Sequence, residues 1–148
     1  MQKSNCLVKY DWDHEFNELL VICGHCSLIR NGLVIGNSAH LDLFTCYMEL
    51  HRVETLAFTY YYNSFIDYKY EVTPSKSNPK LLLPSKERAI VECIKFLDNV
   101  DEGLLVEALK SYLDYFWDDR IYEVGLHFGV SRETLDYWFQ EAKEDCEI

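Results

Sequence analysis

The chain has 148 residues, of which 49% are apolar and 15% aromatic, and its formal net charge is −11. The apolar fraction argues against a disordered chain, and the length predicts one domain or two small lobes that share a core. The negative charge argues against direct binding to nucleic acid or to an anionic membrane, because both are polyanions.

Neither a membrane span nor a signal peptide is expected. No apolar run reaches the ~18 residues of a membrane helix, and residues 1–16 lack the apolar core of a secretory signal. We therefore expect a cytoplasmic location without membrane contact, in which the six cysteines would be reduced thiols.

Residues 1–80 are predicted to form a strand-rich lobe, and residues 81–148 an acidic helical lobe. The Asn31-Gly32 pair between two apolar runs predicts a hairpin, since a type I′ turn needs positive φ at both central residues. The elements expected before the first long helix are a strand over 6–10, a helix over 14–22, a hairpin over 27–35, a helix over 39–50 with a strand as the alternative for its second half, strands over 53–62 and 65–72, a loop over 73–79 and a strand over 81–83.

Two cysteines three positions apart, Cys23 and Cys26, could form a redox pair or half of a zinc site. No thioredoxin-like βαβ pattern surrounds them, which argues against redox chemistry. Zinc would need two more ligands, and the weak candidates Cys46 and His51 are spaced so that one helix face would not hold both. We therefore expect structural cysteines, no bound metal and no cofactor.

The helical lobe carries most of the charge, because residues 85–148 contain seven basic and sixteen acidic side chains. Ser85 and Asp101 are expected to cap two helices, since each side chain can accept a hydrogen bond from the first turn. The second of these helices is expected to end near residue 115. Arg88 is expected to tie the first helix to a carbonyl or carboxylate of the strand lobe.

Residues 121–142 have the pattern of a helix-turn-helix, in which two helices meet across a short turn. Gly125 is expected where the second helix crosses closely, and Gly129 where a left-handed residue ends the first helix. Trp138 and Phe139 continue the apolar spacing of the second helix and are predicted to face the core.

The exposed side of the second helix is poorly suited to DNA. Arg132 is the only basic side chain in its first turns, beside Glu133 and Asp136, whereas DNA affinity depends on lysine and arginine at phosphates. A protein partner with a basic surface is therefore expected, with the oligomeric state open. Two alternatives remain: a helix-turn-helix transcriptional regulator, and a phage-encoded inhibitor whose carboxylates mimic nucleic acid.

The sequence shows no pattern of an active site. It contains no Gly-rich phosphate loop, no His-Glu-x-x-His motif and no Gly-x-Ser-x-Gly nucleophile elbow. Asp42 follows a Gly-Asn-Ser segment but lacks the second aspartate of a nucleotidyltransferase metal site. We expect no catalytic residue and no enzymatic activity.

Residues 83–92, with the sequence Leu-Pro-Ser-Lys-Glu-Arg-Ala-Ile-Val-Glu, combine an apolar strand with a Ser-x-Glu-Arg-Ala helix start, and residues 101–109 supply the helix that follows. In these features residues 82–144 resemble the C-terminal part of AbiEi-type antitoxins of bacterial type IV abortive-infection systems. The resemblance implies toxin neutralisation or partner contact. The family's N-terminal DNA-binding winged helix has no counterpart in residues 1–80, so DNA binding is not implied.

These patterns predict an α+β protein with a small, mostly antiparallel N-terminal sheet and short helices, followed by four helices that end in a helix-turn-helix-like pair. The predicted function is that of a non-catalytic, antitoxin-like interaction module in a bacterial or phage defence-related system. The residues expected to contact the partner are Asp114, Asp118, Asp119, Arg132, Glu133, Asp136 and Tyr137. The residues expected to support the structure are Ser85, Arg88, Gly129 and Trp138.

Overall fold

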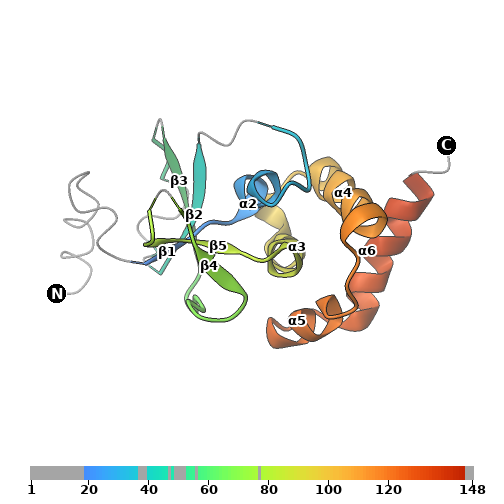
Figure 1. Ribbon diagram of the computed structural model, residues 1–148. Coiled ribbons are helices and arrows are strands. Elements are labelled where there is room, and N and C mark those ends of the chain that lie inside the picture. Colours follow the sequence, from blue (N-terminus) through green and yellow to red (C-terminus); the bar gives the residue numbers. More distant parts are fainter. Residues whose placement is uncertain are drawn as a thin grey trace.

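The structure is a computed structural model that describes residues 19–36, 40–46, 48, 53–55, 57–76 and 78–145. Its strands lie on one side of the molecule and its last helices on the other (Figure 1). The predicted α+β class and the order of a small sheet region followed by helices are confirmed.

The strands form two small sheets. They are β1 (Leu20–Val21), β2 (Leu41–Thr45), β3 (Phe58–Tyr62), β4 (Val72–Pro74) and β5 (Leu81–Pro84). One sheet has the order β1-β5-β4, and the other pairs β2 with β3. β1 is parallel to β5 and β2 is parallel to β3, while β4 and β5 are antiparallel. Strand pairing is therefore mixed rather than mostly antiparallel.

A short helix, α2 (Gly24–Arg30), replaces the first strand of the predicted hairpin. Asn31 has a φ of −86°, so it cannot take part in a type I′ turn, and only Gly32 has positive φ, at 75°. The Asn31 side-chain amide donates a hydrogen bond to the Pro84 carbonyl (3.0 Å). A contact with β5 therefore holds the end of α2, which local sequence patterns cannot reveal.

The reverse change occurs in two places, where a strand forms in a segment that was predicted to be a helix. The described part of the segment predicted as a helix over 14–22 contains β1. The described part of the segment predicted as a helix over 39–50 contains β2, which lies mainly in the first half of that segment, whereas the alternative placed a strand in its second half. Both segments pair with strands distant in sequence, which overrides local propensity. The strand predicted over 53–62 begins only at Phe58, and β4 takes the first positions of the loop predicted over 73–79. β5 confirms the strand predicted over 81–83. The strand predicted over 6–10 lies outside the described residues.

The segment from Phe65 to Tyr70 is a turn, although the prediction placed a strand there. The Asp67 carboxylate accepts hydrogen bonds from the backbone N–H groups of Lys69 (2.8 Å) and Tyr70 (3.0 Å). An aspartate that binds its own following backbone in this way favours a turn over a strand.

The C-terminal half begins at the predicted caps. Ser85 accepts a hydrogen bond from the Arg88 backbone (3.1 Å) and Asp101 from the Gly103 backbone (2.8 Å), so both N-caps are confirmed. The helices and helical turns of this half are α3 (Lys86–Lys95), η3 (Leu97–Asn99), α4 (Glu102–Ser111), η4 (Tyr112–Phe116), α5 (Ile121–His127) and α6 (Arg132–Asp145).

α5 and α6 form the predicted helix-turn-helix-like pair. Gly129 has a φ of 80° in the turn between them, the left-handed conformation that follows a helix end. Val130, Leu135 and Trp138 are buried in the cluster formed by the helices. These positions agree with the sequence pattern.

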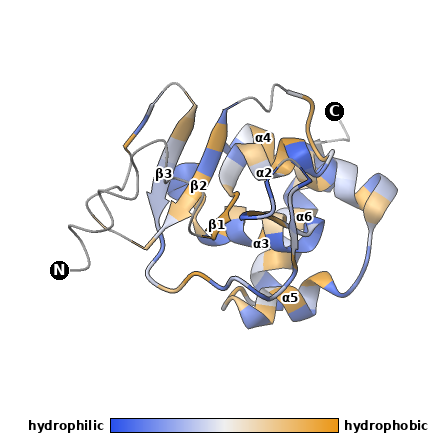
Figure 2. Cartoon of the chain, turned by 60° about the vertical axis from the view of Figure 1, so that its left-hand side comes forward, coloured by the Kyte–Doolittle hydropathy of each residue, from blue (hydrophilic) through white to orange (hydrophobic). Residues whose placement is uncertain are grey.

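One apolar core joins the two halves of the chain. Leu28 and Leu33 are buried in the same cluster as Ile90 of α3 and Leu109 of α4. α3 lies between the strands and the last helices (Figure 1), and the helices carry apolar and hydrophilic segments side by side (Figure 2). No helix in the described ranges is long and apolar enough to cross a bilayer.

Replacing Gly125 by alanine should lower the free energy of unfolding by about 1–3 kcal/mol, because a Cβ there would crowd a packed core. The added atom would lie 2.7 Å from Leu135 Cδ1 and 2.9 Å from the Val130 carbonyl oxygen. Urea denaturation measures the change. Gly103→Ala is the matched control, since its Cβ would meet only Asp101 Oδ1, at 3.3 Å. Equal stability of both variants would mean that α5 and α6 do not cross at Gly125.

Candidate functional site

Three consecutive aromatic side chains after the end of α4 are exposed. The helix was expected to continue to about residue 115, but it widens into a π-helical turn, η4. Tyr115 is 78% exposed, and Phe116 and Trp117 are 39% and 45% exposed. A π turn shifts the angular position of the residues that follow it, and such turns are frequent at functional sites. Here it directs three consecutive aromatic residues to the surface.

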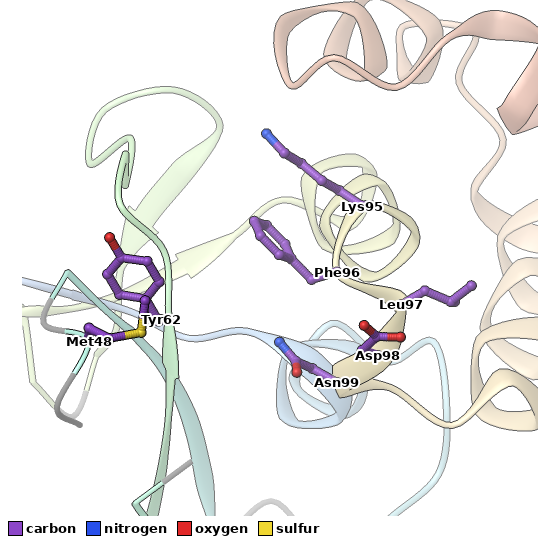
Figure 3. A pocket seen from close by; sticks show the side chains of 7 residues that line it. All are labelled: Met48, Tyr62, Lys95, Phe96, Leu97, Asp98 and Asn99. Carbon is purple, nitrogen blue, oxygen red and sulfur yellow. The ribbon is translucent and has the colours of Figure 1, made fainter. Parts of the chain in front are cut away.

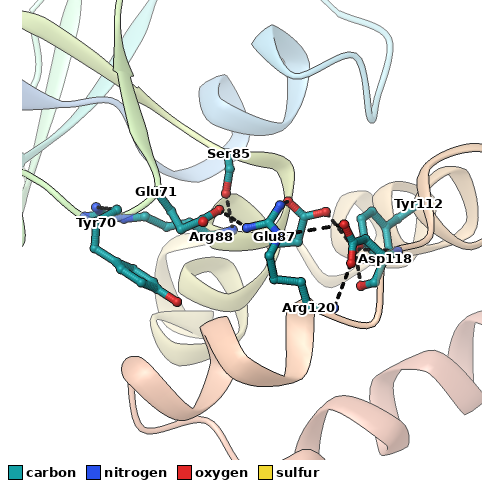
Figure 4. Close-up of polar contacts among 8 residues, drawn as sticks. All are labelled: Tyr70, Glu71, Ser85, Glu87, Arg88, Tyr112, Asp118 and Arg120. Atoms are coloured by element: carbon teal, nitrogen blue, oxygen red, sulfur yellow. Dashed lines mark hydrogen bonds and ion pairs between the residues drawn. The ribbon is translucent and has the colours of Figure 1, made fainter.

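A buried tyrosine fixes the turn that follows. The Tyr112 hydroxyl donates to Glu87 Oε2 (2.8 Å) and accepts from the Asp118 backbone N–H (3.1 Å) (Figure 4). Burial, and then the neighbouring Glu87 carboxylate, raise the pKa of Tyr112, so the hydroxyl stays protonated and can donate. Trp117 thus lies beside a backbone segment that is anchored to α3.

Arg120 connects the same turn to two other segments. Its guanidinium contacts Glu87 Oε1 (2.8 Å) and forms an ion pair with Glu71, while Nε lies 3.7 Å from Asp118 Oδ2 (Figure 4). The hydrogen bond to Glu71 is the main cause of the raised pKa of Arg120. Since Glu71 precedes β4 and Glu87 lies on α3, this cluster holds the start of α5 against both the sheet and α3.

A groove of about 320 Å³ opens beside Trp117, between η4, α5 and α6. The rings of Trp117, Tyr122 and Phe139 meet nearly at right angles, with interplanar angles of 71°, 74° and 87°. Their centroids are 5.3–6.3 Å apart. The side chains that line this groove, called the aromatic groove below, are those of Leu113, Trp117, Tyr122, Asp136, Phe139, Gln140 and Lys143.

Arg132 and Asp136 lie at one side of the aromatic groove. The Tyr122 hydroxyl donates to Asp136 Oδ1 (2.5 Å), and the guanidinium carbon of Arg132 lies 3.9 Å from the centroid of the Tyr122 ring. Arg132 Nε is also 3.9 Å from Asp136 Oδ2. Burial, and then the Asp136 carboxylate, raise the pKa of Tyr122 to about 12. The only basic residue in the first turns of α6 therefore packs on its own chain.

The predicted partner-binding residues lie on adjoining surfaces rather than in one cluster. Asp114 on η4 and Asp119 in the next turn are exposed, and Asp118 binds Arg120. On α6, Arg132 and Asp136 face Tyr122, whereas Glu133 and Tyr137 are exposed one position further round the helix.

The sequence interpretation missed the side chains that shape the aromatic groove. Trp117 and Tyr122 were not predicted to form a site, whereas Phe139 was predicted to face the core, which its 4% exposure confirms, but not to line a groove. A usable signal was present, because Tyr115-Phe116-Trp117 is an aromatic run that comes directly before two aspartates at a helix end. The missing information was the π turn, which places this run at the surface.

Arg88, predicted to tie α3 to the strand lobe, is fully buried and donates from Nη1 to the Tyr70 carbonyl (2.7 Å). Its Nη2 forms an ion pair with Glu92 Oε2 (3.1 Å), and its guanidinium lies 4.9 Å from the centre of the Phe128 ring. Within the described part of the chain, Arg88 Nε and Glu92 Oε1 have no hydrogen-bond partner. Burial outweighs the attraction of Arg88 and raises the pKa of Glu92 to about 7.

The cysteine pair lies at the start of α2, in the interior. Burial raises the thiol pKa of Cys23, Cys26 and Cys93, and a protonated buried thiol is a poor nucleophile and metal ligand. Cys46 is exposed, and His51 lies outside the described residues. Among the described residues, no three His, Cys, Asp or Glu side chains are grouped so that they could hold a metal ion.

A second cavity, of about 430 Å³, lies between the end of β3 and the segment after α3 (Figure 3). Tyr62 and Met48 lie on one side of it, opposite Lys95, Phe96 and Asn99. Among the described residues that line it, the charged groups are Lys95 and Asp98, and none carries a thiol, an imidazole or an aliphatic hydroxyl. The described lining of the aromatic groove shares this feature.

A scan against protein-family models found no match to this chain, and a search of curated proteins found none either.

Proposed function

We propose that this chain is a non-catalytic protein-interaction module that binds a protein partner with a basic surface. The main support for this proposal is the exposed run Tyr115-Phe116-Trp117, which lies within a strongly acidic helical half. Aromatic residues are enriched in protein interfaces, and complementary charge speeds association. The contacts of Tyr112 and Arg120 with the buried Glu87 hold this surface in one conformation, which lowers the entropy lost on binding.

The arrangement of α6 supports a protein rather than DNA as the partner. Arg132 stacks on Tyr122 and lies beside Asp136, so a phosphate near it would also meet a carboxylate. Glu133 in the same turn is exposed and adds a second negative charge. Phosphate contacts supply most of the affinity for DNA, and this surface offers few.

The antitoxin-like part of the proposal rests on the resemblance of residues 82–144 to AbiEi-type antitoxins. Glu87 and Arg88, which carry part of that resemblance, are both buried, and each binds a segment outside α3. They would therefore support the shape of the module, while the partner would contact residues outside this motif.

Charge reversal tests the proposed surface. We expect Asp119→Lys with Glu133→Lys to slow association with a captured partner by about tenfold or more, and we expect the wild-type rate to fall with salt. Glu102→Lys with Glu107→Lys is the control, because these carboxylates are exposed on α4. Surface plasmon resonance measures both rates. Equal loss in both double variants would mean that total charge acts, rather than this surface.

DNA binding is tested separately by fluorescence anisotropy with duplex DNA. We expect no sequence-specific binding tighter than about 1 μM at ~150 mM salt. Specific binding at that level that is abolished by Arg132→Ala would overturn the proposal and establish a helix-turn-helix regulator.

A further inference from the structure

We propose that the aromatic groove receives a cationic side chain, arginine or lysine, from the protein partner. This inference rests on the proposed function and names the group that the partner would insert. The groove combines three aromatic rings that meet nearly at right angles, Trp117, Tyr122 and Phe139, with the Asp136 carboxylate.

The arrangement of the rings suits a cation. A cation is attracted to the face of an aromatic ring, and rings set at right angles can present faces and edges to one small volume. Trp117, the most favourable ring type for such contact, is 45% exposed and lines the groove. The groove volume of about 320 Å³ is at the lower end of the range for small-ligand sites, which suits one side chain.

The chain already places its own cations on neighbouring aromatic rings. The Arg132 guanidinium carbon lies 3.9 Å from the Tyr122 ring centroid, and Lys86 Nζ lies 4.7 Å from the Phe116 ring centroid. The surface thus already binds both cation types that a protein partner can supply. An incoming side chain would use the ring surface that remains open at Trp117.

The charge of the segments around the groove favours a cation over a neutral ligand. The segments that build the groove, residues 113–123 and 132–144, contain eight acidic and three basic side chains. Among the residues that the structure describes, the charged side chains lining the groove are Lys143 and Asp136, so the excess of negative charge comes from the surrounding segments rather than from the lining itself. Tyr115 and Phe116 directly precede Trp117 in the chain and are also exposed, so the exposed aromatic run is larger than a small free cation would cover, and we assign the ligand to a protein.

The test uses the full chain and the probe acetyl-Gly-Arg-Gly-amide, with its neutral citrulline analogue as the control. We expect the indole N–H signal of Trp117 to shift saturably in ¹H–¹⁵N NMR spectra with the arginine probe alone, at constant ionic strength. Trp138, which is buried, gives an internal reference. Equal shifts with the citrulline probe, or no shift at Trp117, would overturn the inference.

Two substitutions with opposite expected signs separate binding from a general structural effect. Gln140→Lys should weaken binding of the arginine probe by about fivefold, because it adds a positive charge to the groove lining. Lys143→Gln should strengthen binding by a similar factor, because it removes a positive charge there. Gln140 and Lys143 are exposed on α6, so both variants should fold. A change in the same direction for both variants would overturn the inference.

Further comparisons separate this inference from the proposed function. If tetramethylammonium binds the groove more tightly than the arginine probe, the site serves a small cation and the inference is wrong. If the probe does not bind but partner association still depends on Asp119 and Glu133, the inference fails and the proposed function stands. If the probe binds but the partner association is unaffected by Gln140→Lys, the assignment to the partner's side chain is wrong.

Discussion

Replacing Arg88 by methionine should lower the free energy of unfolding by about 3–5 kcal/mol at pH values above 7, because it leaves the Glu92 carboxylate buried without its cation. Both side chains are almost fully buried, and the ion pair between them is 3.1 Å long. The substitution also removes the hydrogen bond to the Tyr70 carbonyl, which joins α3 to the turn before β4. Chemical denaturation followed by circular dichroism measures the loss.

The size of this loss should depend on pH. The pKa of Glu92 is raised from 4.5 to about 7, so as the pH falls through this range the folded state takes up a proton before the unfolded state does. The Glu92 carboxylate therefore lowers the free energy of unfolding most above about pH 7. It lowers it progressively less as the pH falls from there towards 4.5, the pKa of this group in the unfolded chain. Removing Arg88 raises the pKa further. The difference in free energy of unfolding between the wild type and the Arg88→Met variant should be smaller at pH ~5.5 than at pH ~8, by more than about 1 kcal/mol.

The double variant Arg88→Met with Glu92→Leu is the control for this interpretation. It removes both charges, so it should recover most of the stability lost by the single variant and should lose its extra pH dependence. Lys95 and Asp67 also act on Glu92, but both are present in every protein compared. A double variant as unstable as the single variant would show that packing, rather than the unpaired carboxylate, causes the loss.

Replacing Trp138 by alanine should lower the free energy of unfolding by about 3–5 kcal/mol, because the large side chain lies in the core shared by the helices. Trp138 is 7% exposed and belongs to the same buried cluster as Leu135 and Val130. Tyr137→Ala is the matched control, since Tyr137 precedes it on α6 and is 58% exposed. We expect the control to change stability by less than about 1 kcal/mol. A loss below about 1 kcal/mol for Trp138→Ala would contradict the packing of α5 against α6.

The helical half was predictable because its signals are local. Ser85 and Asp101 cap the helices that they precede, and Gly129 takes the left-handed conformation that its position suggests. Each of these roles depends on a hydrogen bond or a dihedral angle within one turn of the residue itself. The sequence alone therefore determined where α3 and α4 begin and where α5 ends.

The strand-rich half was predicted less well because its contacts are distant in sequence. β1 depends on pairing with β5, and β2 on pairing with β3. Asn31-Gly32 has the composition of a hairpin turn, yet the bond from Asn31 to Pro84 belongs to a helix end. Local preference is weak beside such tertiary contacts.

The sequence by itself determined the acidic charge of the helical half and the exposure of polar residues on α6, because both follow from composition and helical spacing. Only the tertiary structure decided where the aromatic groove lies. The π turn at η4, and the contacts of Tyr112 and Arg120 with Glu87, bring Trp117 beside Tyr122 and Phe139. No local pattern encodes that arrangement, since its parts come from α3, η4, α5 and α6 and meet only when the chain is packed.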